Sequence, residues 1–167
     1  ETGGTLYVSD GIIEISPIQK VNGDVALSTG NIKFPGSVHV QGSVRSGFYV
    51  VAGAGIQVGE GIEAGLLSAE ESIVVRQGIR GAGKAALRSK EQIEAYFAER
   101  ATLLAVGDIT LRNTCLHCSV KTNGKLTVLG GKGRLVGGRI EARRGVSAHD
   151  IGAPAETATH ISFGQDY

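Results

Sequence analysis

The sequence predicts an all-β chain that winds into a parallel β-helix of about seven or more coils, each stacked on the one before. Two observations lead to this fold class. Short aliphatic pairs recur along the chain at a nearly constant interval, and glycine supplies 26 of the 167 residues while proline supplies only 3. Because the glycines lack the G-X-Y period of collagen, we expect them at the corners of an ordered chain.

The repeat consists of pairs of the form apolar-x-apolar that begin 16 to 20 residues apart. Spacings that vary around 18 without drifting indicate seven copies of one coil, and further apolar groups predict two or three short strands in each. Among these groups we expect Ile62 with Ala64 and Leu66 with Ser68 to face inward. The seven pairs are Val38/Val40, Ile56/Val58, Ile73/Val75, Ile93/Ala95, Ile109/Leu111, Leu126/Val128 and Val146/Ala148.

The repeat divides the chain into three segments. Residues 1–29 precede the first copy, and the pairs Thr5/Tyr7 and Ile13/Ile15 predict a strand or hairpin that caps the open first coil. Residues 30–164 form the predicted β-helix domain, and residues 165–167 form a short tail. A coil cannot bury its own inward side chains, so its stability must come from stacking on its neighbours.

Residues 90–104 have two readings. Taken alone, KEQIEAYFAERATLL resembles an amphipathic helix, with Ile93, Phe97 and Leu104 near helical spacing. The repeat favours a strand instead, because Ile73 and Ile109 lie two coils of 18 residues apart and Ile93 falls near the start of the coil between them. We therefore predict a strand.

The composition disfavours several classes of function. Lys and Arg total 17 against 16 for Asp and Glu, so the positive excess typical of a nucleic-acid binder is absent and we expect no nucleic-acid partner. No apolar stretch approaches the ~20 residues of a transmembrane segment. Aromatic residues make up 5% with no Trp, which disfavours a groove that stacks on sugars.

The two cysteines, Cys115 and Cys118, flank His117 and form a small cluster with metal-ligating chemistry. We expect no metal there, since a strand would point the two cysteines to opposite faces and no second ligand group follows. We predict that both cysteines are free thiols that pack as small hydrophobic groups. Two cysteines without a disulfide framework also indicate a reducing, cytoplasmic compartment. A redox role for the pair stays open.

No pattern predicts catalysis or a cofactor. The glycine-rich run 78–84 (GIRGAGK) precedes another predicted strand, whereas a phosphate cradle requires a helix N-terminus, and Lys84 is followed by Ala85 rather than Ser or Thr. The five aspartates are dispersed, which disfavours the calcium site of a β-helix lyase. We therefore expect a protein that is not an enzyme and binds no cofactor.

One concentration of charge stands out as a candidate partner-binding site. It lies within a single coil, and Glu141 is the acidic residue inside it. A solvated outer face is the simplest explanation, and a face that contacts an acidic partner is the functional one; DNA phosphate or anionic lipid is a weaker option. The cluster comprises Lys132, Arg134, Arg139, Arg143 and Arg144.

Several stretches also resemble one family in order along the chain. They are VNGDVALSTGNIKFPGSVHVQGSVRSGF (21–48), GIRGAGKAAL (78–87), LHCSV (116–120), and KGRLVGGRIEA with IGAPAETATHISFG (132–164). These are similar to the β-helix domain of the bacterial flagellar assembly protein A (FapA) family, and more distantly to the β-helices of MinC and the bactofilins. The resemblance is specific because non-repetitive pieces occur in the family's order.

The resemblance implies a single-stranded right-handed β-helix in the cytoplasm that acts as a scaffold for protein contacts in flagellar assembly or polar localisation. The partners it implies are a regulatory protein of the sugar phosphotransferase system or flagellar and polar factors, with a polar or membrane-peripheral position of the full-length protein. Self-association is a further option. The alternative functions are a bactofilin-like self-assembling filament and, less favoured, a sugar- or acyl-acting β-helix enzyme.

Overall fold

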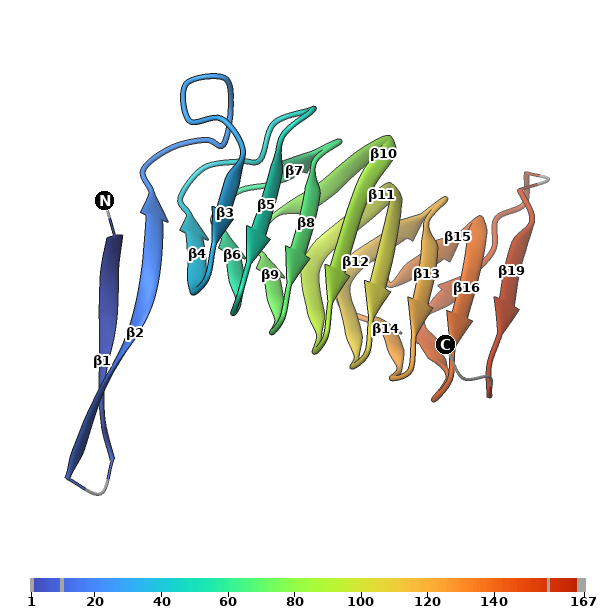
Figure 1. Cartoon of the computed structure of the whole chain (residues 1–167). Coiled ribbons are helices and arrows are strands. Elements are labelled where there is room, and N and C mark those ends of the chain that lie inside the picture. The colour runs from blue at the N-terminus through green and yellow to red at the C-terminus, as the bar shows by residue number, and fades with distance from the viewer. Residues whose placement is uncertain (1, 10, 156, 165–167) are drawn as a thin grey trace.

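The computed structural model describes residues 2–9, 11–155 and 157–164. These residues form nineteen β-strands and no helix, and the strands stack in a solenoid of about eight coils (Figure 1). The predicted all-β class and the parallel coiled architecture are confirmed. A helix long and apolar enough to span a bilayer does not occur in this part of the chain.

Each coil crosses three walls, named wall A, wall B and wall C in the order in which the chain reaches them. Wall A contains β2 (Ile12–Val21), β4 (Ser37–Val40), β6 (Ile56–Val58), β9 (Ile73–Val75), β14 (Leu126–Val128), β17 (Val146–Ala148) and the first parts of β11 (Ile93–Ala105) and β12 (Ile109–Leu116). Wall B contains β7 (Ile62–Glu63), β15 (Arg134–Val136), β18 (Asp150–Ile151), the first part of β10 (Gly78–Ser89), the middle of β11 and the end of β12. Wall C contains β3 (Ile32–Phe34), β5 (Tyr49–Ala52), β8 (Leu66–Ala69), β13 (Ser119–Thr122), β16 (Gly138–Ala142), β19 (Thr159–Ser162) and the last parts of β10 and β11.

Inward side chains at equivalent positions of successive coils form the core. On wall A the predicted pairs occupy these positions: Ile93 pairs with Ile109 and Ile109 with Leu126, and all three side chains are at most 1% exposed. Each such side chain contributes about 1.5 to 3 kcal/mol by leaving water. The stack continues along walls B and C, so one aliphatic core runs through the solenoid.

The strand prediction for residues 90–104 is confirmed. β11 covers Ile93–Ala105, and the residues Ile93 and Leu103 point into the core. Phe97 is half-buried on the outside of wall B, where it lies against Gly78. Local helix propensity is overridden because β10 and β12 offer this segment hydrogen-bond partners on both sides.

The predicted inward positions on wall C are wrong by one residue in the third coil. Leu67 and Ala69 are buried at 3%, whereas Leu66 is 49% exposed and Ser68 is half-buried. The cause is the corner before β8, where Ala64 adopts a left-handed backbone with φ of 45°. A left-handed residue turns the chain and resets the in-out alternation, so the side chain that follows by simple counting ends outside.

The N-terminal segment forms a hairpin of β1 (Thr2–Ser9) and β2. The two strands pair antiparallel from Thr2 opposite Gln19 to Ser9 opposite Ile12. The end of β2, from Ile18 to Val21, pairs parallel with β4. β1 therefore extends wall A at its N-terminal edge, and Figure 1 shows the paired strands reaching beyond the other strands of that wall.

The last coil is less well covered than those before it. Val146 and Ala148 of β17 are half-buried, and Ile151 is 54% exposed although it stacks on Leu135 of the buried column in wall B. Phe163, just after β19, is 66% exposed. The two ends of the described solenoid therefore differ, since Val21 and Val25 of the first coil are buried.

Candidate functional site

The structure divides the predicted basic cluster among different sides of one coil. Lys132 lies in the connection between β14 and β15, and Arg134 lies in β15 on wall B. Arg139 lies in β16 on wall C, and Arg143 and Arg144 follow that strand at the corner that leads back to wall A. All five residues are exposed. They share a coil, as predicted, but they do not form one patch.

Wall C keeps part of the cluster together. Along β16 and the residue after it, side chains alternate, so Arg139, Glu141 and Arg143 belong to the outer face while Ile140 and Ala142 fill the core. Lys121 of β13 lies beside Glu141 in the register of the two strands. This part of wall C therefore has a mixed but mainly basic surface.

Glu141 pairs with two of the basic side chains on this surface. Its side chain is only 6% exposed, and it accepts a hydrogen bond from Arg139 Nε at 2.7 Å and pairs with Lys121 Nζ at 3.2 Å. Burial opposes ionisation, but these two partners outweigh it and hold the pKa of Glu141 below its usual range. Arg139 is therefore both a surface charge and the counterion of a buried carboxylate.

A second acidic partner lies outside the basic run. Arg144 Nη1 is 3.9 Å from Asp108 Oδ1, and both side chains are largely exposed. Arg134 faces Asp150 in the register of β15 and β18. Glu141 is thus not the only carboxylate near these charges, and mutual repulsion within the cluster is weaker than its sequence suggests.

The N-terminal half of wall C has a different character. Tyr49 and Leu66, neighbours in the register of β5 and β8, are 40% and 49% exposed. Together with half-buried Val51, Ala86 and Leu104 they border a shallow hollow of about 570 Å³. The complete lining is Lys33, Tyr49, Val50, Val51, Leu66, Leu67, Ser68, Ala86, Leu87, Arg88 and Leu104.

The hollow arises from the order of side-chain sizes on stacked strands. In one outward column Lys33, Val51, Ser68, Arg88 and Leu104 follow one another in register. In the next column Tyr49 and Leu66 are followed by the smaller Ala86. Small side chains among larger ones leave a depression. Sequence reasoning missed this surface because it assigned Leu66 to the core; the consecutive leucines at 66 and 67 were the available signal.

A family model described as the Flagellar Assembly Protein A (FapA) beta solenoid domain matches residues 17–167. The chain belongs to the FapA family. The resemblance seen in the sequence is thereby confirmed. No curated protein and no solved structure matches the chain.

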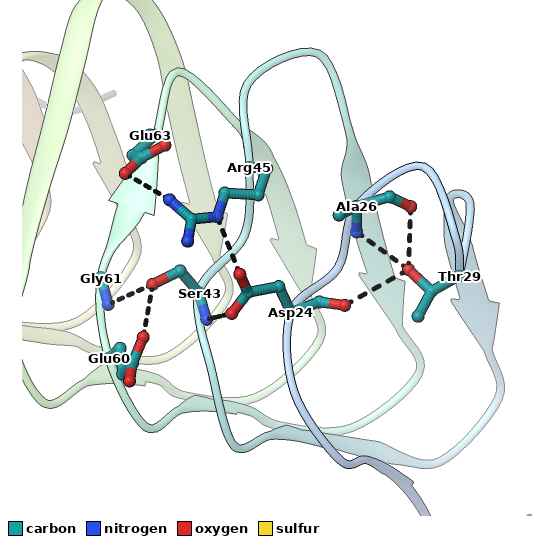
Figure 2. A network of polar contacts seen from close by, with 8 residues as sticks. All are labelled: Asp24, Ala26, Thr29, Ser43, Arg45, Glu60, Gly61 and Glu63. Carbon is teal, nitrogen blue, oxygen red and sulfur yellow. Dashed lines mark hydrogen bonds and ion pairs between the residues drawn. The ribbon is translucent and has the colours of Figure 1, made fainter.

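In this FapA solenoid, wall B carries a ladder of charges that joins the first coils. Asp24 accepts hydrogen bonds from the backbone N–H of Ser43 and from Arg45 Nε, both at 2.8 Å, and Arg45 Nη1 donates to Glu63 at 2.8 Å (Figure 2). The Ser43 N–H and the Arg45 guanidinium lower the pKa of Asp24. Asp24 and then Glu63 raise the pKa of Arg45. Ser43 Oγ also donates to Glu60, 3.0 Å away.

The ladder continues along wall B. Arg80 lies between Glu63 and Glu99 in the register of β7, β10 and β11. Its guanidinium carbon is 5.6 Å from the centroid of the Phe97 ring, within the range of a cation–π contact. Positive and negative groups thus alternate from Arg45 to Glu99. In these coils wall B therefore places charges of opposite sign beside one another.

The two cysteines both face the core, and the expectation that they point to opposite faces is wrong. Cys115 is fully buried and Cys118 is 1% exposed, and both are free. His117 lies between them with φ of 53°, and this corner between β12 and β13 turns both side chains inward. A hydrogen bond shared with Cys118, together with burial, raises the pKa of the Cys115 thiol well above its usual value. The pair packs as small apolar side chains.

Other candidate chemistry finds no geometric support. Within residues 2–9, 11–155 and 157–164, no three His, Cys, Asp or Glu side chains lie close enough together to hold a metal ion. The glycine-rich run from Gly78 to Lys84 belongs to β10 and is followed by the rest of that strand. It lacks the helix N-terminus whose N–H groups bind phosphate.

Proposed function

We propose that this FapA solenoid is a non-enzymatic cytoplasmic scaffold that holds protein partners on wall C during flagellar assembly or polar localisation. The supporting observation is the composition of that wall. Its outward side chains include an exposed apolar group around Tyr49 and Leu66 and a basic group around Arg139 and Arg143. Membership of the flagellar assembly family supports the process, and the resemblance suggests a phosphotransferase regulatory protein or polar factors as partners.

The basic part of wall C gives a direct test. We expect the double variant Arg139→Gln with Arg143→Gln, made in the full-length protein, to reduce swimming through soft agar and recovery of the partner from the source bacterium. Neutral glutamine is chosen because Arg139 is the counterion of buried Glu141, and glutamate there would add a repelling charge. Partner recovery should also fall as salt rises, because exposed charges are screened.

A matched control separates wall C from net charge. The double variant Lys132→Gln with Arg134→Gln also removes two positive charges from this coil, but it leaves wall C unchanged. It should swim like the parent, and circular dichroism should show both double variants folded. Equal effects of the two variants, or no effect of either, would contradict the proposal.

A second candidate function is favoured by the last coil. Ile151 and Phe163 are more than half exposed at the C-terminal end of the described solenoid. Such an end is suited to stacking on another copy, as in a bactofilin-like filament. Light scattering of the purified protein distinguishes the two functions. If the protein forms filaments, the scattered intensity should be high, and Ile151→Lys should reduce it.

A further inference from the structure

The hollow on wall C has the features of a docking groove. It has a volume of about 570 Å³, and exposed Tyr49 and Leu66 with half-buried Leu104 line it. The charged residues of its lining are both basic, Lys33 and Arg88. An apolar surface bordered by one sign of charge calls for a partner of complementary pattern, with apolar side chains at its centre and carboxylates at its margin.

The hydrogen bonds of wall C decide the conformation of that partner. β5 pairs with β3 and β8, and the end of β10 pairs with β8 and β11, so the backbone beneath the hollow is already bonded on both sides. An extended peptide lying on this surface would lose water from its own N–H and C=O groups without gaining partners. An α-helix satisfies these groups internally and contacts the wall through side chains alone.

Charge also disfavours a second copy as the occupant. Two copies facing each other through this hollow would bring Lys33 and Arg88 of one against the same cations of the other. Like charges brought together at an interface oppose association. Neither cation is neutralised by an acidic residue within the hollow's lining. A partner that supplies carboxylates avoids this cost.

We propose that this hollow binds an amphipathic α-helix of a partner protein, whose apolar side chains at i, i+3 or i+4, and i+7 enter between Tyr49, Leu66 and Leu104. Acidic side chains of the helix lie beside Lys33 and Arg88. The five strands from the coil of Lys33 to that of Leu104 span about 19 Å at ~4.8 Å per coil, which matches about 13 residues of helix at 1.5 Å each. The inference rests on the proposed scaffold function and names the chemistry of the partner.

Two synthetic peptides test the proposal. Both are fluorescent 15-residue helices with leucines on one face, and they differ only in carrying Glu or Lys beside that face. Titration with the full-length protein, followed by fluorescence anisotropy, should show the Glu peptide binding at least tenfold more tightly. The double variant Lys33→Glu with Arg88→Glu should reverse the preference.

Single substitutions locate the binding. Leu66→Ser should weaken the Glu peptide at least fivefold, because it removes an exposed anchor without touching the core. Leu129→Ser is the matched control, since Leu129 is 39% exposed but follows β14 on wall A. It should leave the affinity unchanged. Equal binding of the two peptides, or equal loss in the two serine variants, would overturn the proposal.

Two further measurements separate the helix proposal from self-association through the hollow and from the proposed scaffold function. If sedimentation velocity shows a dimer that Leu66→Ser abolishes, the hollow is a contact between copies and the helix proposal is wrong. The peptides report on the hollow whatever the native process is. Peptide binding as expected, combined with normal swimming of the Leu66→Ser strain, would support the helix site and contradict the scaffold function proposed for wall C.

Discussion

The stacked core predicts a large and local cost for removing one inward side chain. Ile109 is fully buried on wall A, between Ile93 on one coil and Leu126 on the next. Replacing it with alanine removes three carbon atoms from the middle of this stack. The neighbouring coils are held at a fixed spacing by their ladders of hydrogen bonds, so they cannot move together to fill the space.

The magnitude follows from two contributions. Transfer of three buried carbons accounts for about 2.4 kcal/mol at ~0.8 kcal/mol each. The cavity adds to this, because large-to-small changes in rigid cores cost 2 to 5 kcal/mol in total. We therefore expect Ile109→Ala to lower the free energy of unfolding by about 3 to 4 kcal/mol.

Urea denaturation followed by circular dichroism measures this effect. Thr110→Ala is the matched control, because Thr110 is the next residue of the same strand and points outward. It should change stability by less than about 0.5 kcal/mol. If Ile109→Ala costs under ~1 kcal/mol, or if both variants cost the same, the inward register of wall A is wrong.

Two further predictions concern contacts between residues of neighbouring coils. Asp24→Asn should lower stability at neutral pH and remove part of the loss on acidification: the folded state depresses the pKa of Asp24 below 3.8, so its contribution is present above that pH and is lost as the pH falls through the lower folded value. The difference between the urea midpoints at pH 7 and pH 3 should be smaller for the variant than for the parent. An equal difference in both proteins would contradict a stabilising interaction of Asp24 with Arg45 and the Ser43 N–H. Gly138→Ala should destabilise by about 2 kcal/mol or more in thermal melts, because φ is +80° and the new Cβ would overlap the carbonyl oxygen of Cys118. Gly145→Ala, with φ of +102° and open space around it, should cost less, and equal losses would refute the overlap.

The sequence predicted wall A well and walls B and C less well, for a structural reason. On wall A each strand contributes two inward residues separated by one outward residue, as in Ile56 and Val58, so simple alternation identifies them. The corner between walls B and C interrupts the alternation with residues of positive φ. These residues include Ala64, Arg100 and His117. Because these three are not glycine, residue type alone does not show at which position the alternation is reset.

The same corner explains the errors at named side chains. Simple alternation from Ile62 places Leu66 inside, but Leu66 lies outside because left-handed Ala64 resets the alternation. Simple alternation places Cys118 opposite Cys115, but both side chains face the core because left-handed His117 lies between them. The left-handed residues Ala64, Ala82, Arg100 and His117 recur about one coil apart, so the alternation is reset at the same place in successive coils.

Candidate sites were harder to predict because proximity in sequence is not proximity on a wall. The basic run from Lys132 to Arg144 covers about two thirds of the coil between Leu126 and Val146, so it passes more than one side of the solenoid. The hollow shows the opposite case. Its residues Lys33 and Arg88 are separated by 55 positions in the chain but lie in one outward column. Such a surface becomes visible only once the register of every coil is known.

Alternation along each strand also separates binding from stability in this fold. Leu66 and Leu67 are consecutive, yet the first is half exposed in the hollow and the second is 3% exposed in the core. A change at the outward position alters what the wall presents and leaves the stack beneath it unchanged. A change at the inward position costs core packing whatever wall it lies on. Wall C can therefore differ from wall B in its surface chemistry while both rest on the same aliphatic core, and this separation suits the scaffold function proposed for wall C.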